Sequence, residues 1–278
     1  MITDCHVDLP WAFTKQRPSV VTVEGMKAGG VDRAICALYL SDAMQDQLGD
    51  GISIEPIYQQ FFALRQRPEL LFALEGGRLI HNNLNQLRAY KLICGIKYLT
   101  LTHNYDTEWA SSATDDGQFP LTPLGKEVVG ECEKLHVTVD VSHCSDPTID
   151  SVLDIATRPV IASHSGARCM LNHPRNLTDT HILRIFEGGG TVCVPFARRF
   201  VKDIDGVVRH ICHIIHVTGS YESVGIGSDL DGAACVVQDM AGWKIITDKL
   251  SNAFRDEAVK AICGDNVARV LGIADCQE

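Results

Sequence analysis

The sequence contains no run of basic residues and no long apolar segment. Its 278 residues carry a formal net charge of −10 at pH 7, and nucleic-acid phosphates bind clustered Lys and Arg, so no nucleic-acid partner is expected. No apolar run reaches the roughly 18 residues that a membrane span needs, and no signal-peptide pattern follows Met1. We therefore predict a cytoplasmic protein that has no membrane partner and acts on small molecules.

The sequence also lacks a CxxC pair, although it contains eleven cysteines. An odd number of scattered cysteines, several of them inside apolar runs, does not fit a disulfide framework. We interpret them as reduced, mostly buried thiols. Cys5 and Cys144 flank His6 and His143. Because neighbouring residues of a strand face opposite sides, we do not expect both members of either pair to bind a metal.

No linker or low-complexity tract interrupts the chain, so we expect a single domain over residues 1–278. Short β-branched apolar runs alternate with amphipathic segments of helical length, which is typical of a parallel sheet. The runs and the chain length fit the eight strands of a barrel, and the predicted fold class is α/β, a single (β/α)₈ TIM-like barrel. The predicted strands are Ile2–Asp8, Arg33–Leu40, Leu70–Glu75, Gly95–Thr102, Val137–Ser142, Pro159–Ser163, Thr191–Phe196 and Ser223–Ser228.

Cap signals mark several of the intervening helices. Thr122 followed by Pro123 predicts a helix that extends to about Leu135, and Asp146 followed by Pro147 predicts the start of the next helix. Glycine is common where helices end, because it adopts the left-handed conformation easily. The glycines expected at helix ends are Gly188, Gly219 and Gly264.

Ionisable residues stand at the carboxyl ends of six predicted strands, and in a (β/α)₈ barrel these ends converge on one mouth. The residues are His6, Asp8, Glu75, His103, His143, His164 and Asp229. The spacing of His6 and Asp8 places both on one face of the first strand. A lone histidine at a strand end is usually structural, but burying so many ionisable groups together is costly unless a cation compensates them.

This combination of side chains favours a metal centre. Imidazole and carboxylate ligands suit zinc and its neighbours, and the absence of a thiolate cluster argues against an iron–sulfur or structural zinc site. One catalytic zinc takes about three protein ligands, so the larger set favours two divalent metal ions, with Zn²⁺ the expected metal, bridged by a carboxylate. Such a pair can activate water near neutral pH, because coordination lowers the pKa of water to about 7.

The remaining histidines are interpreted as residues without a metal role. They are His210, His213 and His216 on a predicted helix, and His81, His136, His173 and His181 as surface residues of loops or helix starts. The small residues Gly225, Gly227 and Gly232 surround Asp229, where they would let its carboxylate approach a ligand.

Seven segments match the motifs of one known family in that family's order. They are DCHVDLP from Asp4, ALEGG from Ala73, GIKYLTLTHN from Gly95, VDVSHCS from Val139, PVIASHSGA from Pro159, HPRN from His173 and VGIGSDLDG from Val224. HxD alone is a weak motif, but the ordered set spans most of the chain and is specific. The chain resembles the membrane dipeptidase (renal dipeptidase) family of the amidohydrolase superfamily.

The resemblance implies a binuclear metal-dependent dipeptidase. By position in the motifs, His6 and Asp8 would bind one metal ion and His143 and His164 the other, while Glu75 would bridge the two. The expected substrate is a small dipeptide. Because bacterial relatives often accept a D-residue at the second position, L-Xaa-D-Xaa dipeptides are candidates, and the dimer contact of relatives leaves a homodimer open.

The resemblance also implies that three further residues bind the substrate, two of them catalytic. His103 matches the histidine that faces the substrate carbonyl and stabilises the oxyanion. Arg175 matches the arginine that holds the free C-terminal carboxylate, a task for a planar bidentate donor. Asp229 matches the acid/base that moves a proton between the attacking water and the leaving amine.

Two other functions stay open. A lactonase or deaminase could use the same two-metal mouth, since such a site can attack esters, amides or amidines. Arg175 favours a dipeptidase over these, because a carboxylate clamp has little use for a neutral ester. A non-catalytic binding barrel is the second alternative, and the presence of all expected ligands together with Asp229 argues against it.

Overall fold

Eight parallel strands, each hydrogen-bonded to the next in the sequence, form the centre of the computed structural model, which describes residues 1–48 and 54–273. The strands are β1 (Thr3–Val7), β2 (Arg33–Leu38), β3 (Leu70–Glu75), β4 (Tyr98–Thr100), β5 (Thr138–Asp140), β6 (Ile161–Ala162), β7 (Thr191–Val194) and β8 (Val224–Ile226). Backbone hydrogen bonds from Asp8 N to Leu230 O (2.8 Å) and from Asp229 N to His6 O (3.0 Å) connect the two ends of the sheet. The strands therefore form a nearly closed barrel, and the predicted (β/α)₈ fold is confirmed.

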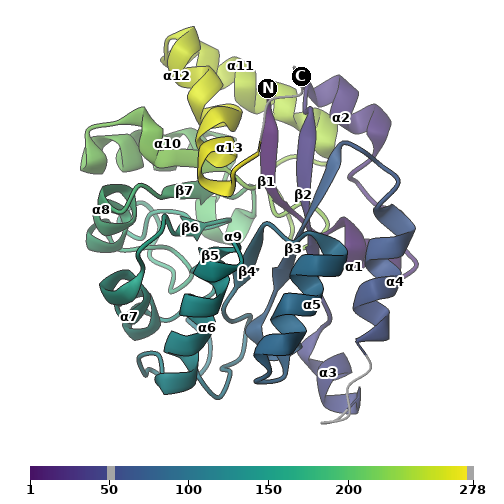
Figure 1. Ribbon diagram of the computed structural model, residues 1–278. Helices are drawn as coiled ribbons and strands as arrows, with labels where there is room; N and C mark the ends of the chain where they lie inside the picture. Colours follow the sequence, from purple (N-terminus) through teal and green to yellow (C-terminus); the bar gives the residue numbers. More distant parts are fainter. Residues whose placement is uncertain (49–53, 274–278) are drawn as a thin grey trace.

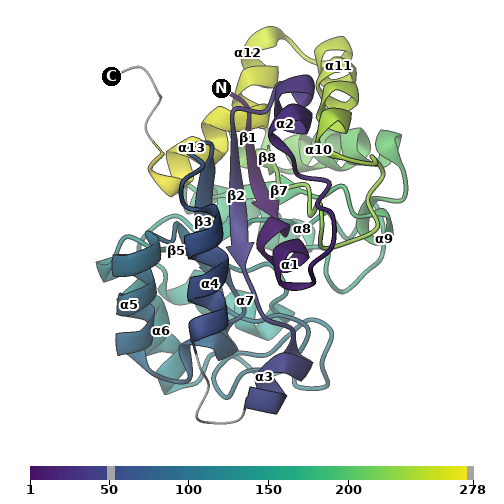
Figure 2. The ribbon, with the colours of Figure 1, turned by 90° about the vertical axis from the view of Figure 1, so that its right-hand side faces the viewer.

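Helices cover the outside of this barrel (Figures 1 and 2). They are α1 (Leu9–Thr14), α2 (Val23–Gly29), α3 (Asp42–Leu48), α4 (Glu55–Leu64), η1 (Gly77–Ile80), α5 (Leu84–Cys94), α6 (Pro123–Lys134), α7 (Asp146–Ile155), α8 (Asp179–Glu187), α9 (Arg198–Val201), α10 (Ile204–Thr218), η2 (Tyr221–Ser223), η3 (Met240–Gly242), α11 (Trp243–Ala253), α12 (Asp256–Lys260), η4 (Ala261–Asp265) and α13 (Asn266–Leu271). Among the helices of the described ranges, none combines the length and the apolar character that a membrane crossing requires.

All eight predicted strands are present, and most are shorter than predicted. β3 has the predicted bounds Leu70–Glu75, whereas the strand predicted from Gly95 begins at Tyr98. Gly95 is the left-handed residue that ends α5, with φ 64°. The glycine therefore belongs to the helix end and not to the strand.

The predicted start of α6 is confirmed, and that of α7 lies one residue earlier than predicted. The Thr122 side chain accepts a hydrogen bond from Gly125 N at the start of α6. At α7 the capping residue is Ser145, whose side chain accepts from Thr148 N, and Asp146 is the first residue of the helix. Ser and Asp both cap well, and the hydroxyl takes the role here.

The prediction that Gly264 ends a helix is wrong, whereas Gly188 and Gly219 do follow α8 and α10. Gly264 lies inside the π-helical turn η4, and the helix continues through α13 to Gly272, which is left-handed. A Cβ atom at Gly264 would collide with the carbonyl oxygen of Met1. Glycine is therefore required here because η4 packs closely against Met1.

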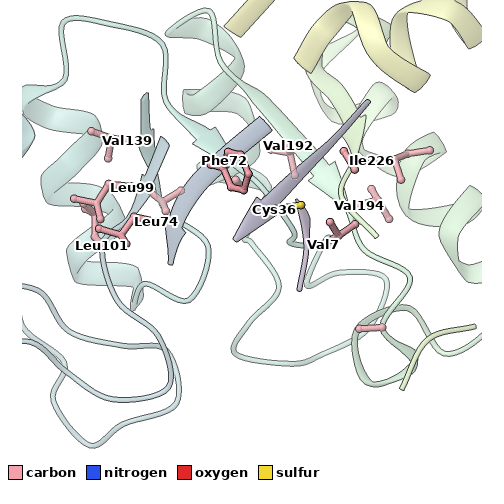
Figure 3. Close-up of a cluster of buried hydrophobic side chains, with 14 of the residues drawn as sticks. Val7, Cys36, Phe72, Leu74, Leu99, Leu101, Val139, Val192, Val194 and Ile226 are labelled. Carbon is pink, nitrogen blue, oxygen red and sulfur yellow. The ribbon is translucent and has the colours of Figure 1, made fainter. Parts of the chain in front are cut away.

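The strands separate two buried apolar clusters. The larger cluster lies between the strands and the helices and includes Val7, Cys36, Phe72, Leu74, Leu99, Leu101, Val139, Val192, Val194 and Ile226 (Figure 3). The smaller cluster contains the alternate residues of the same strands, together with Val267 of α13. The strand residues include Ile35, Ala73, Tyr98 and Cys193. Because successive strand residues face opposite sides, this second cluster fills the barrel interior.

β1 contains a β-bulge immediately before the mouth. Asp4 and Val7 pair with residues that are only two positions apart on β2, so β1 carries one extra residue between them. Cys5 packs in the interior cluster, and the His6 ring also turns into the barrel, where its Nδ1 lies 2.8 Å from the Tyr98 hydroxyl. The rule that strand neighbours face opposite sides therefore gives the wrong prediction for Cys5 and His6.

The cysteines of the described residues are free thiols, and most of them are buried, as predicted. Cys169 and Cys212 are exposed. Neither Cys5 nor Cys144 belongs to a candidate metal group of the described residues. Cys276 lies outside the described residues.

Candidate active site

The barrel mouth brings together all seven ionisable residues predicted at strand ends. β1 and β3 position His6, Asp8 and Glu75, and the loops after β4, β5, β6 and β8 carry the other four: His103, His143, His164 and Asp229. His103 is half-buried and the other six are buried. Residues that are up to 223 positions apart thus share one site, as the fold predicted.

Three imidazoles converge on one carboxylate oxygen. The Oε1 atom of Glu75 lies 3.6 Å from His6 Nε2, 3.3 Å from His143 Nε2 and 3.6 Å from His164 Nε2. The Nε2 atoms of His143 and His164 lie 2.9 Å apart. Glu75 is therefore the residue on which the three imidazoles of the site converge.

Tyr98, which the sequence analysis did not single out, orients the His6 ring. The Tyr98 hydroxyl donates a hydrogen bond to the Cys5 carbonyl oxygen over 3.1 Å and lies 2.8 Å from His6 Nδ1. Since its only proton is used, the Tyr98 oxygen accepts the Nδ1–H of His6. In the neutral ring this assignment places the lone pair of His6 on Nε2, and Nε2 has no hydrogen-bond partner among the described residues.

Ser163 and Asp140 form an equivalent arrangement at His164. The Ser163 hydroxyl donates to Asp140 Oδ2 over 2.7 Å, and its oxygen lies 2.8 Å from His164 Nδ1. The hydroxyl oxygen therefore accepts the Nδ1–H of His164, which again directs an Nε2 lone pair toward Glu75. Metal-binding histidines commonly have such a partner on the second ring nitrogen.

Asp8 and Asp229 form the other side of the centre. Asp8 Oδ2 lies 3.5 Å from His6 Nε2, and oxygen atoms of Asp8 and Asp229 lie within 4.8 Å of a nitrogen of His6. A Cβ atom at Gly232 would overlap Asp8 Oδ2 and would lie 2.6 Å from Asp229 Oδ1. Gly232 therefore leaves room for both carboxylates, whereas Cβ atoms at Gly225 and Gly227 would meet Cys193 and Ser163. That these glycines let Asp229 approach a ligand stays a prediction. His143 and Asp229 have positive φ angles of 69° and 63°, which are uncommon for residues other than glycine.

Burial and mutual charge raise the pKa values of Glu75 and Asp229 in this centre. Burial raises the pKa of Glu75, and burial together with the charge of Asp8 raises the pKa of Asp229 well above its usual range. Burial alone would lower the pKa of His6, but the charges of Glu75 and Asp8 outweigh it and raise this pKa to about 10. Such crowding of acidic groups is compensated when a cation binds among them.

The residues present fit divalent metal ions. Three overlapping groups have ligand atoms within 4.8 Å of one another: His6, Glu75 and His164; Glu75, His103 and His143; and His6, Asp8 and Asp229. Burial lowers the pKa of His143 and His164 well below the usual range, so both rings are neutral and keep a lone pair for a metal. The orphaned, fully buried Nε2 atom of His6 is the most direct indication of a missing ligand.

A cavity of about 340 Å³ opens above this centre, a size that accepts a small ligand. Asp8, Glu75, His103, His143, Arg175 and Asp229 line it. His6 and His164 are buried behind it, next to Glu75.

Arg175 is an unpaired cation in the wall of the cavity. Only 3% of its surface is exposed, and its Nε and Nη2 atoms have no hydrogen-bond partner among the described residues. Its guanidinium lies 5.3 Å from the ring centroid of Phe200. Burial lowers the pKa of Arg175 to about 10, although Asp229 and Glu75 oppose the shift. Buried donors without acceptors indicate a place for an anionic group of a ligand.

His103 faces the cavity from the loop after β4 and has two partners behind it. Its Nδ1 atom lies 3.3 Å from the Tyr39 hydroxyl and 3.4 Å from Asp42 Oδ2. The centroids of the His103 and His143 rings are 4.5 Å apart. His103 can therefore direct Nε2 into the cavity while Nδ1 is held by Tyr39 and Asp42.

His173 and His181, which were interpreted as surface residues, are more buried than predicted. His173 is half-buried and lines the cavity, where its Nδ1 accepts a hydrogen bond from Arg175 N over 3.1 Å. His181 is only 4% exposed, and its Nε2 lies 3.3 Å from Asp150 Oδ1. The position of His173 beside Arg175 in the HPRN segment was the available signal for its place in the site.

Trp11, Tyr39, Arg199 and Phe200 also line the cavity and were not predicted. They stand in loops or in the short helices α1 and α9. No motif or periodicity marks such residues, because their position depends on how the loops fold over the mouth.

The family model of the membrane dipeptidases (peptidase family M19) matches residues 59–277, which is more than half of the chain. Two uncharacterized dipeptidases of Schizosaccharomyces pombe are 34% identical over 223 residues and 35% identical over 273 residues. These alignments cover 76% and 91% of this chain. The chain spans only 54% and 63% of the length of these two relatives.

A solved structure supports the fold. A metallopeptidase of Rhodobacter sphaeroides, bound to a phosphinate mimic of the dipeptide L-Ala-D-Ala, superimposes with a TM-score of 0.87 at 20% sequence identity. The match covers 98% of both chains. At this identity the likeness concerns the architecture of the barrel.

Proposed function

The chain belongs to the membrane dipeptidase family (peptidase family M19), and on this premise we propose that it is a metal-dependent dipeptidase with a binuclear centre. The observation that carries the proposal is the convergence of three imidazole Nε2 atoms on Glu75 Oε1. Beside them lies the buried Arg175, whose Nε and Nη2 atoms have no acceptor among the described residues. The first feature suits metal ions, and the second suits the free carboxylate of a short peptide.

In this proposal His6 and Asp8 hold one ion, His143 and His164 hold the other, and Glu75 lies between them. When bound, the ions would activate a water molecule and polarise the substrate carbonyl. Zn²⁺ is the proposed metal, because imidazole and carboxylate ligands suit it. Tyr98 and Ser163 contribute by holding the rings of His6 and His164 with Nε2 toward Glu75.

Arg175, His103 and Asp229 act on the substrate. Arg175 binds the C-terminal carboxylate through its free Nε and Nη2 donors, which orients the scissile bond over the centre. His103 donates from Nε2 to the oxyanion that develops on the peptide carbonyl. Asp229 takes a proton from the attacking water and delivers it to the leaving amine, a task helped by burial, which raises its pKa.

The substrates are proposed to be small dipeptides, including L-Xaa-D-Xaa. The cavity of about 340 Å³ limits the ligand to a small one. The dipeptide mimic bound to the Rhodobacter sphaeroides protein gives the second position a D-residue, and this supports testing that stereochemistry here.

A hydrolysis screen tests this function. The purified chain, reconstituted with Zn²⁺, is incubated with libraries of L-Xaa-L-Xaa and L-Xaa-D-Xaa dipeptides, and released amino acids are measured. We expect hydrolysis of free dipeptides and little hydrolysis of lactones or amidines. Turnover of lactones or amidines without turnover of dipeptides would contradict the proposal and would indicate a lactonase or deaminase instead.

The role of Arg175 has its own test. Removing one charge-assisted pair costs about 1.5–3 kcal/mol of binding, so Arg175→Met should raise KM for dipeptides by roughly ten- to a hundredfold. A C-terminally amidated dipeptide should bind poorly to the wild-type enzyme and change little in the variant. Equal losses for the free and the amidated peptide would contradict the carboxylate clamp.

A further inference from the structure

We propose that Arg199 selects dipeptides whose C-terminal residue has an acidic side chain, an inference that rests on the proposed dipeptidase function. Arg199 lies on α9, is exposed, and lines the same cavity as Arg175 and Asp229. Within the described chain, no residue forms a hydrogen bond or an ion pair with its guanidinium. Arg175 and Arg199 are the two Lys or Arg residues among the described residues that line this cavity.

The charge of Arg199 has no partner among the residues that the structure describes, and a dipeptide has only one main-chain carboxylate. The neighbouring Arg198 shows the contrast, because its Nε donates to the Cys235 carbonyl oxygen over 2.9 Å and it does not line the cavity. Once Arg175 holds the main-chain carboxylate, Arg199 is left to attract a second anionic group. That group must come from a side chain of the substrate.

The neighbours of the two arginines indicate which residue of the dipeptide carries the acidic side chain. The Arg175 guanidinium lies over the Phe200 ring, and Phe200 directly follows Arg199. The His173 ring lies 4.9 Å from Phe200, and the charges of both arginines contribute, after burial, to the lowered pKa of His173. Arg175 and Arg199 thus share one wall of the cavity. A side chain that reaches Arg199 therefore belongs to the residue whose carboxylate is on Arg175, which is the C-terminal one.

The test compares two dipeptides that differ only in charge, L-Ala-D-Glu and L-Ala-D-Gln, and the same pair with L-residues at the second position. The readout is the ratio of kcat/KM for the acid to that for the amide. Because Arg199 is exposed, a salt bridge to it is worth up to about 1 kcal/mol, which corresponds to a ratio of about five. The ratio should fall toward one at high ionic strength, since salt screens exposed charges.

The variants separate the role of Arg199 from that of Arg175. Arg199→Met should bring the ratio to about one by lowering kcat/KM for the acid more than that for the amide. Arg199→Glu should instead favour L-Ala-D-Lys over L-Ala-D-Glu. Arg198→Met, on the same helix, should keep the wild-type ratio. Arg175→Met should weaken the acid and the amide together.

Three outcomes would overturn the inference. A ratio of one between the kcat/KM values for the acid and the amide in the wild-type enzyme would show that Arg199 does not recognise an acidic side chain. Equal loss of both substrates in Arg199→Met would show that it binds the main-chain carboxylate instead. If no dipeptide is cleaved, the proposed function fails and this inference fails with it, whereas cleavage without an acidic preference removes this inference alone.

Discussion

Tyr98 shows how a residue outside the ligand set controls the ligands. Its hydroxyl has one proton, which goes to the Cys5 carbonyl oxygen, so its oxygen has to accept from His6 Nδ1. The tautomer of His6 is therefore determined by a side chain in the barrel interior. Tyr98 was not predicted as a site residue, because it lies within an apolar strand segment, where a tyrosine is expected to be part of the hydrophobic core.

The first prediction concerns this residue. Tyr98→Phe removes the acceptor for His6 Nδ1–H, so the ring can rotate or change tautomer. Loss of such a partner typically costs 10–100-fold in metal affinity. Competition with a chromophoric chelator measures the affinity. Tyr90→Phe is the matched control, since Tyr90 is also fully buried but donates to the Leu79 carbonyl oxygen. Equal loss of affinity in both variants would contradict the role of Tyr98 as a positioning residue.

The second prediction concerns Asp229. If Asp229 moves the proton, Asp229→Asn should lower kcat by about 10²–10⁴-fold, because the amide keeps the shape of the carboxylate but cannot accept a proton. Metal stoichiometry should not change. Both quantities are measured on the same preparation. Because Asp229 oxygen lies within 4.8 Å of ligand atoms of His6 and Asp8, joint loss of metal and activity would reassign it to metal binding.

The seven mouth residues could be predicted because each ends an apolar run that continues into a polar loop, and because a barrel gathers strand ends. Arg175 lies in a loop and was identified only from its family motif, HPRN. His173 was misjudged for a related reason, since its burial depends on the packing of its ring against Phe200, which is 4.9 Å away between centroids. Contacts of this kind leave no periodic pattern in the sequence.

At the level of elements, the alternation of apolar runs predicted all eight strands, but it could not predict the bulge in β1. The bulge turns both Cys5 and His6 toward the barrel interior. A strict alternation of inward and outward residues along the strand does not predict that two neighbouring side chains face the same side. The Asp4 carboxylate helps to fix the bulge, because its Oδ1 accepts from His6 N at 3.2 Å and from Ser228 N at 2.8 Å.

The third prediction uses two helical glycines with opposite surroundings. Gly264→Ala should destabilise the fold, because the added Cβ atom would collide with the Met1 carbonyl oxygen. Gly130, inside α6, has nothing within 4 Å of an added Cβ atom, so Gly130→Ala should stabilise the fold by about 0.5–1 kcal/mol. Urea unfolding measures both. A stabilising Gly264→Ala would contradict the close packing of η4 against the start of the chain.

At the scale of the whole molecule, β1 and β8 close the barrel, and residues in or just after these strands meet at the candidate metal centre. Trp243 of α11 donates to Asp4 Oδ2 over 2.8 Å, and Asp4 in turn binds the backbone after β8. Partners separated by more than 220 residues are not visible in local patterns. From the sequence, closure of the sheet into a barrel could be inferred only indirectly, because eight predicted strands match the number in a (β/α)₈ barrel. The single domain, the cytoplasmic location and the homodimer stay predictions.

The last prediction follows from the charges that the closed barrel brings together. Three buried carboxylates, Asp8, Glu75 and Asp229, repel one another when no cation is present, and burial raises the pKa of the latter two. A metal that binds only the folded state stabilises it by about 2.7 kcal/mol at a hundredfold excess over Kd. Removing metal with a chelator should therefore lower Tm by roughly 5–10 °C, at about 2–4 °C per kcal/mol.

Glu75→Gln decides whether this stabilisation comes from a bridged pair of ions. The amide leaves the central position with one oxygen and no charge, so the variant should bind clearly less than the roughly two equivalents expected of the wild-type protein. Its Tm should then respond weakly to chelator. Asp248→Asn is the control, because Asp248 forms only an exposed pair with Lys244 and should leave stoichiometry and Tm shift unchanged. If Glu75→Gln retained the full metal content and the full Tm shift, Glu75 would not be a bridging ligand, and the ions would be held by the histidines and Asp8 alone.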